Sequence, residues 1–113
     1  MTVRISPSVL AADFAALGAG VAAVEAGGAD LIHVDVMDGH FVPNLTIGPP
    51  VVKALHRAAH VPLDVHLMIT DPERYIDAFA DAGAAMISVH VEAATHLHRT
   101  ITHIKERGIQ AGA

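Results

Sequence analysis

The sequence contains no cysteine, so disulfide bonds and thiol chemistry are excluded. Lysine and arginine together number only 7 of the 113 residues, and the formal net charge is −5. This acidic balance, with no basic stripe, argues against a nucleic-acid partner. No apolar run reaches the roughly 18 residues that a membrane helix needs, so we also expect no membrane partner. The first residues show no secretory signal pattern, and the cytoplasm is the expected compartment.

Aromatic residues make up only 4% of the chain, whereas hydrophobic residues make up 52%. The hydrophobic share exceeds the usual value of about 45–50%, and alanine, valine, isoleucine and leucine supply most of it. Small aliphatic side chains of this kind favour helices that pack tightly on a buried sheet. The length of 113 residues allows one small domain at most.

Apolar periodicity predicts strands that alternate with helices along the whole chain. Strands are predicted at 4–10, 31–37, 63–69, 86–91 and 109–113. Four helices are predicted between them, beginning at Asp13, at Pro49-Pro50, at Thr70 or Asp71, and at Thr95. The third helix is expected to bury Tyr75 with its other apolar residues. Short connections between consecutive elements require a parallel sheet with right-handed crossovers, so the predicted fold class is α/β.

The predicted strand at 31–37 carries the polar residues that most need an explanation. His33 and Asp35 interrupt its apolar run at i, i+2, so both side chains point to the same face. Burying an unpaired carboxylate is costly or shifts its pKa, whereas a metal ion or a reacting proton would explain its presence. Asp38-Gly39 ends the strand. The polar pair is therefore near the C-terminal end of the strand, where α/β enzymes place their sites.

The predicted strand at 63–69 repeats this pattern, with Asp64 and His66 on one face. If the two strands are neighbours, His33, Asp35 and His66 converge on one point. Two imidazoles and a carboxylate are ligands suited to one divalent metal ion, such as Zn, Mn, Fe or Co. The alternative is a buried polar network that holds the sheet together.

Three further sets of residues share faces with these positions or with the neighbouring strands. Met37 and Met68 occupy the next positions along the two faces and, taken alone, are core residues. Ser8 lies on the first predicted strand and is a weak signal by itself. His90 and Glu92 share a face of the fourth predicted strand. A role as hydrogen-bond partners of the metal ligands and a purely structural role are equally expected there.

Four segments of the chain resemble the ribulose-phosphate 3-epimerase family. They are residues 5–14 (ISPSVLAADF), 33–44 (HVDVMDGHFVPN), 63–68 (LDVHLM) and 87–93 (ISVHVEA), and the match runs in register from residue 4 to residue 113. The family fold is a TIM barrel, in which eight βα units close around a central sheet. The resemblance implies that residues 1–113 supply about the first four βα units, as the N-terminal half of a single barrel domain.

The resemblance implies an isomerase that interconverts D-ribulose 5-phosphate and D-xylulose 5-phosphate. In this chemistry a divalent metal ion stabilises the enediolate that forms when the C3 proton leaves the substrate. His33, Asp35 and His66 match three of the family's four protein metal ligands. Asp35 also matches one of its two acid/base carboxylates, so it is the predicted catalytic residue.

Other positions of the chain match the family's substrate site. Ser8 and His66 match residues that contact the sugar phosphate. Met37 and Met68 match methionines that pack over the reacting carbons, where they exclude water from the enediolate. We expect the enzyme to be a homo-oligomer.

The family's second catalytic aspartate and its phosphate-binding loops come from later strands than this chain contains. Half a barrel would expose an inner face and two strand edges. We therefore expect either that two copies dimerise to close a barrel-like core or that the chain belongs to a longer enzyme. The second is favoured, because the last residues fall inside a predicted strand.

Three alternative functions remain open from the sequence. A related 3-epimerase acting on a six-carbon ketose phosphate, such as allulose 6-phosphate, would use the same strands. A decarboxylase or isomerase of the ribulose-phosphate-binding barrel group would share the scaffold, but a His-x-Asp strand beside an Asp-x-His strand argues against it. A half-barrel that binds a metal ion or a partner without turnover would not be an enzyme.

Overall fold

The computed structural model describes residues 3–9 and 14–113. The strands are β1 (Ile32–Met37), β2 (Leu63–Met68), β3 (Ala84–Val89) and β4 (Gln110–Gly112). The helices are η2 (Phe14–Ala16), α1 (Leu17–Ala26), α2 (Pro49–Ala58), η3 (Pro72–Arg74), α3 (Ile76–Ala82) and α4 (Leu97–Glu106). This alternation confirms the predicted α/β class.

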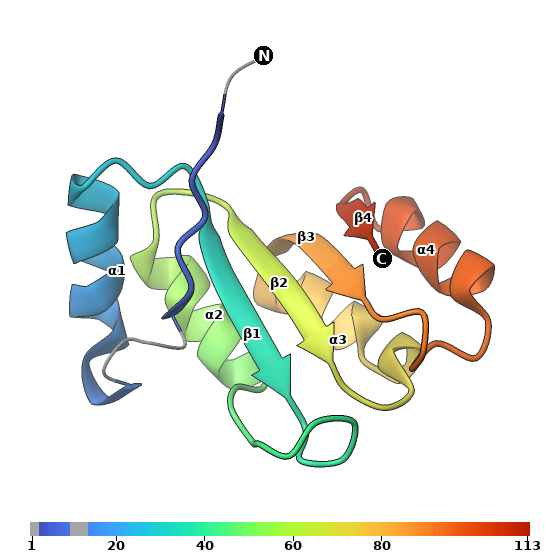
Figure 1. Ribbon diagram of the computed structural model, residues 1–113. Helices are drawn as coiled ribbons and strands as arrows, with labels where there is room; N and C mark the ends of the chain where they lie inside the picture. Colours follow the sequence, from blue (N-terminus) through green and yellow to red (C-terminus); the bar gives the residue numbers. More distant parts are fainter. Residues whose placement is uncertain (1–2, 10–13) are drawn as a thin grey trace.

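The four strands form one sheet in the order β1-β2-β3-β4, and every pair is parallel. Figure 1 shows α2 and α3 behind the sheet, with α1 beside α2. Helix α4 packs on β4. A parallel sheet in sequential order, with a helix in each crossover, is consistent with the N-terminal half of a TIM barrel.

The two faces of β1 and β2 differ because side chains alternate along a strand. In β1, Ile32, Val34 and Val36 are buried, while the residues between them are only half-buried. The buried side chains pack against those of the helices, including Val52 and Leu55 of α2. Each such buried aliphatic side chain stabilises the fold by about 1.5–3 kcal/mol. The helix-free face is left for the polar residues.

The predicted strand at 4–10 is not a regular strand over its described part. The backbone makes one parallel bridge, between Ser8 and His33. The carbonyl oxygen of Pro7 accepts a hydrogen bond from the backbone N–H of His33 at 2.8 Å. Proline has no N–H to donate in return, which keeps the ladder from extending along this edge of the sheet. Leu10 and the helix start predicted at Asp13 lie outside the described residues.

The predicted strand at 86–91 begins and ends two residues earlier, as β3. An irregularity in the β2–β3 pairing lets Leu63 pair with Ala84 and Asp64 with Met86. Beyond β3, the backbone N–H groups of Ala93 and Ala94 donate to the carbonyl oxygen of His90, so a turn ends the strand. His90 therefore follows β3 rather than lying within it.

Helix α3 differs from the prediction at its start. Asp71 precedes η3 in a left-handed conformation with φ 50°, and its side chain makes no capping hydrogen bond. Tyr75 is 41% exposed, so its predicted burial is wrong. At the other end Gly83 has φ 114°, and an added Cβ would lie 2.3 Å from the His56 ring, so glycine is required there. Among the described residues, no helix is long and apolar enough to cross a membrane.

Candidate metal centre

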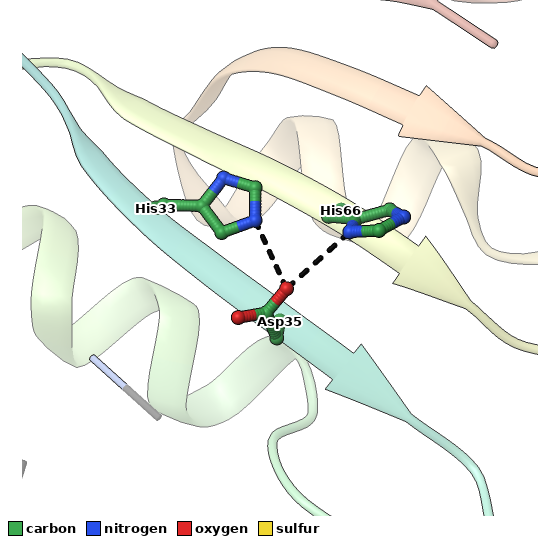
Figure 2. Close-up of side chains that lie close together, drawn as sticks. All are labelled: His33, Asp35 and His66. Carbon is green, nitrogen blue, oxygen red and sulfur yellow. Dashed lines mark hydrogen bonds and ion pairs between the residues drawn. The ribbon is translucent and has the colours of Figure 1, made fainter. Parts of the chain in front are cut away.

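The site lies on the face of β1 and β2 that carries no helices (Figure 2). The strands are paired without a shift, so Asp35 lies opposite His66 and His33 lies opposite Asp64. His33 and Asp35 come from one strand at i, i+2, and His66 comes from its neighbour. The strand pairing therefore brings the three predicted ligands together, as the sequence predicted.

The three side chains converge on the carboxylate of Asp35. Its Oδ1 lies 2.9 Å from Nε2 of His33 and 3.3 Å from Nδ1 of His66, as the dashed lines of Figure 2 show. One ligand atom from each residue lies within 4.8 Å of the other two. Two imidazole nitrogens and one carboxylate oxygen around one point fit a divalent cation such as zinc.

The ring nitrogens that face away from this point also have partners. Nδ1 of His33 lies 2.9 Å from Oδ2 of Asp64, and the hydroxyl of Ser6 donates to the same oxygen at 3.3 Å. Nε2 of His66 lies 2.7 Å from Nε2 of His90. Histidines that bind metals in proteins have their second nitrogen held in this way, often by a carboxylate. The donor set and its supporting contacts thus fit a metal centre.

Asp64 has no predicted role, yet it contacts His33 directly. Its spacing of two residues from His66 is the signal that could have identified it, because the same spacing puts both on one face. Which neighbour Asp64 would contact depends on the register between β1 and β2. That register is a tertiary property.

Opposing effects set the protonation of the three residues. Burial raises the pKa of Asp35, but the Ser8 hydrogen bond and the positive charge of a protonated His33 outweigh burial and lower it. Burial lowers the pKa of His33, but the hydrogen bond to Asp64 and the charge of Asp35 outweigh it and raise the pKa. Burial and the neighbouring His90 lower the pKa of His66, against the effect of Asp35. Asp35 is thus held ionised and His66 neutral.

The remaining predicted site residues lie around this cluster. The hydroxyl of Ser8 donates to Oδ2 of Asp35 at 2.6 Å. Met37 and Met68 are register partners on the same face, two residues beyond Asp35 and His66 respectively. Both are half-buried. The structure places all the predicted site residues on one side of the sheet or at its edge.

Asp38 connects the loops that follow β1 and β2. Its Oδ1 accepts the backbone N–H groups of His40 and Phe41, and its Oδ2 accepts that of Thr70. Burial raises the pKa of Asp38, but hydrogen bonds from backbone N–H groups together outweigh burial and lower it. Asp38 also lines a cavity of about 480 Å³ at the ends of these strands, which His33, Asp35 and His66 do not line.

Comparison with known proteins gives consistent matches. A model described as the ribulose-phosphate 3 epimerase family matches residues 4–113. The chain is 63% identical over 110 residues to ribulose-phosphate 3-epimerase of Bacillus subtilis, covering 97% of this chain and 51% of the relative. It is 53% identical over 111 residues to that of Rhodobacter capsulatus, covering 98% and 49%. The chain spans about half the length of these curated relatives.

Solved structures add a match in fold. A Yersinia pestis DHPS bound to a pterine-sulfa conjugate superposes with a TM-score of 0.64 at 19% identity, covering 96% of this chain and 42% of that one. A dihydropteroate synthetase with a product gives a TM-score of 0.63 at 18% identity, covering 96% and 44%. At this identity the likeness shows the fold alone.

Proposed function

Since the chain belongs to the ribulose-phosphate 3 epimerase family, we propose that it supplies the N-terminal half of a ribulose-phosphate 3-epimerase. This enzyme is an isomerase that interconverts D-ribulose 5-phosphate and D-xylulose 5-phosphate. The observation that carries the proposal is the convergence of His33, Asp35 and His66 on one point of the open sheet face. Residues 1–113 would form half of a single TIM-barrel domain.

Nε2 of His33, Oδ1 of Asp35 and Nδ1 of His66 would hold one divalent metal ion. Such an ion, when bound, stabilises the negative charge that develops on the substrate oxygens as the C3 proton leaves. Two histidines and one carboxylate accept zinc, manganese, iron or cobalt.

Asp35 is the proposed base that takes the proton from C3. Its lowered pKa keeps the carboxylate ionised, and the hydroxyl of Ser8 at Oδ2 fixes its orientation. Inversion at C3 requires a second acid that returns a proton to the opposite face of the substrate. We assign that acid to the C-terminal half of the barrel, on the basis of the family resemblance.

The other predicted residues would bind the substrate and protect the intermediate. Ser8 and His66 are proposed to contact the sugar phosphate. Met37 and Met68 lie side by side in the sheet register and would cover the reacting carbons with apolar groups. Apolar side chains there exclude water without offering a proton to the enediolate.

The test is Asp35→Asn in the native protein, as its source organism makes it. The amide keeps the shape of the carboxylate but cannot accept the C3 proton. We expect epimerisation to fall by at least about 1,000-fold, in line with the 10²–10⁴-fold contribution of general bases. The matched control is Asp81→Asn, since Asp81 pairs with Arg107 on the exposed side of α3. Full turnover of the Asp35→Asn variant would refute the proposal.

Turnover rates of the native protein on two sugar phosphates identify its substrate. We expect faster turnover of ribulose 5-phosphate than of allulose 6-phosphate, and the reverse order would assign the six-carbon alternative. A homo-oligomer and a cytoplasmic location stay predictions from the sequence. Light scattering on the purified native protein measures the first.

A further inference from the structure

The ring of His66 has a polar partner at each of its two nitrogens. Nδ1 lies 3.3 Å from Oδ1 of Asp35, and Nε2 lies 2.7 Å from Nε2 of His90. A neutral imidazole carries one proton, so one nitrogen donates and the other offers a lone pair. Two positions of the proton on His66 are therefore possible. They differ in whether His66 donates a hydrogen bond to Asp35 or to His90.

The two tautomers of His66 differ in what they allow at the metal centre. With the proton on Nδ1, His66 donates to Asp35 and its lone pair faces His90. With the proton on Nε2, His66 donates to His90, and the lone pair of Nδ1 faces Asp35 and His33. Only the second tautomer can bind a cation between the three residues, because a metal ligand needs a free lone pair.

Nε2 of His90 can accept a hydrogen bond from Nε2–H of His66 only when the proton of His90 is on Nδ1. Oε2 of Glu92 lies 3.6 Å from Nδ1 of His90, and its negative charge favours a proton there. The His90 ring also contacts two other rings. It stacks on His66 with ring centroids 4.8 Å apart and lies 5.3 Å from the Phe41 ring.

We propose that His90 is a positioning residue that holds His66 in the tautomer able to bind the metal ion. The proton would lie on Nε2 of His66, and Glu92 would favour the matching proton on Nδ1 of His90. The inference rests on the proposed function, because it concerns the same metal centre. It assigns to His90 the task that Asp64 performs for His33, where a carboxylate contacts the outer nitrogen.

Phe41 and Asp38 extend this support into the loop after β1. The backbone N–H of Phe41 donates to Oδ1 of Asp38 at 2.8 Å. This hydrogen bond fixes the backbone from which the Phe41 ring reaches His90. The loop after β1 thus contacts His90, the hydrogen-bond partner of the proposed metal ligand His66 on β2.

Two variants of His90 separate hydrogen bonding from packing. His90→Phe keeps a ring that stacks on His66 but removes the acceptor. His90→Gln keeps an acceptor oxygen near the place of Nε2 and removes the ring. The control is His98→Phe, which replaces an exposed imidazole on α4.

Two measurements on the native protein and these variants test the inference. The first is the zinc dissociation constant, obtained by competition with a chelator. The second is the tautomer of His66 without zinc, read from long-range ¹H–¹⁵N correlations and assigned with a His66→Asn variant. A purely structural role of His90 would not change the proton position on the His66 ring.

We expect His90→Phe to weaken zinc binding about tenfold or more, in the range seen for outer partners of ligating histidines. We also expect it to move the His66 proton toward Nδ1. His90→Gln should bind zinc within about threefold of the native protein, as should the His98→Phe control. Circular dichroism would establish that each variant is folded.

Three results would overturn the inference. His90→Phe could bind zinc as the native protein does, or both His90 variants could weaken zinc binding equally, which would indicate packing alone. The native protein could also fail to bind zinc, and this would refute the proposed metal centre as well. Zinc binding that depends on His90 in a protein without epimerase activity would refute the proposed function and leave the inference standing.

Discussion

The hydroxyl of Ser8 lies 2.6 Å from Oδ2 of Asp35, although 27 residues separate the two in the chain. The backbone of Ser8 also forms a parallel bridge with His33, the residue two before Asp35. The segment before β1 is not a regular strand, yet it places a donor on the carboxylate oxygen that does not face the two histidines. Oδ1 is thus left for the proposed metal centre, and Oδ2 is oriented from the edge of the sheet.

Replacing Ser8 by alanine is expected to reduce epimerase kcat/KM about tenfold. The change removes one hydrogen bond to a charged group, a loss of about 1.5 kcal/mol. Ser8→Thr retains the hydroxyl and is expected to keep most of the activity. Steady-state assays of both variants make the comparison. An equal loss in the two would assign the effect to side-chain shape.

Asp64→Asn is expected to weaken zinc binding about tenfold, because the charge that holds the outer nitrogen of His33 is lost. The amide oxygen of asparagine still accepts one hydrogen bond from Nδ1, so binding is not abolished. Competition titration with a chelator measures the change. Asp71→Asn is the control, since asparagine tolerates the left-handed backbone at this position. Unchanged zinc affinity in Asp64→Asn would show that His33 needs no outer partner.

Asp38→Ala is expected to lower the free energy of unfolding by about 2 kcal/mol. The substitution leaves the backbone N–H groups of His40, Phe41 and Thr70 without their acceptor. Asp38→Asn keeps one acceptor oxygen and should lose about half as much. Urea denaturation of the native protein and both variants measures the series. Equal stability of the alanine and asparagine variants would mean that these hydrogen bonds contribute little.

Glu25 is expected to make the free energy of unfolding depend on pH in the acidic range. Its Oε2 accepts the backbone N–H groups of His60 at 2.6 Å and Val61 at 3.0 Å. The hydrogen bond from His60 is the main reason why the pKa of Glu25 lies below its usual value of 4.5. A lowered pKa in the fold stabilises the protein above the unfolded pKa, and the contribution is lost as the pH falls through the folded pKa.

The measurement compares the native protein with Glu25→Gln by urea denaturation from neutral pH down to acid. The native protein should be more stable at neutral pH, and the difference should shrink as the pH falls below about 4.5. Glu106→Gln, at the exposed end of α4, is the control and should show a smaller difference. A difference between native protein and Glu25→Gln that stays constant over this range would contradict the prediction.

Much of the fold was predictable because the strands and helices follow from local sequence patterns. Alternation with period 2 located β1 and β2 to within one residue at each end, since their buried residues form continuous rows. Pro49 and Pro50 marked the start of α2. The predicted strand boundaries were wrong where pairing with a neighbouring strand outweighs the local sequence pattern. β3 is shifted by the pairing irregularity at β2, and Pro7 limits the first segment to a single bridge.

Side-chain alternation alone predicts that His33 and Asp35 share a face and that His66 occupies the equivalent face of another strand. Side-chain alternation depends only on the backbone of one strand, so it needs no knowledge of the fold. The packing of the whole fold was needed to show that Asp35 lies opposite His66, that Asp64 contacts His33 and that His90 reaches His66. These contacts depend on strand register, which is set by how the buried side chains pack on the helices and not by local preference.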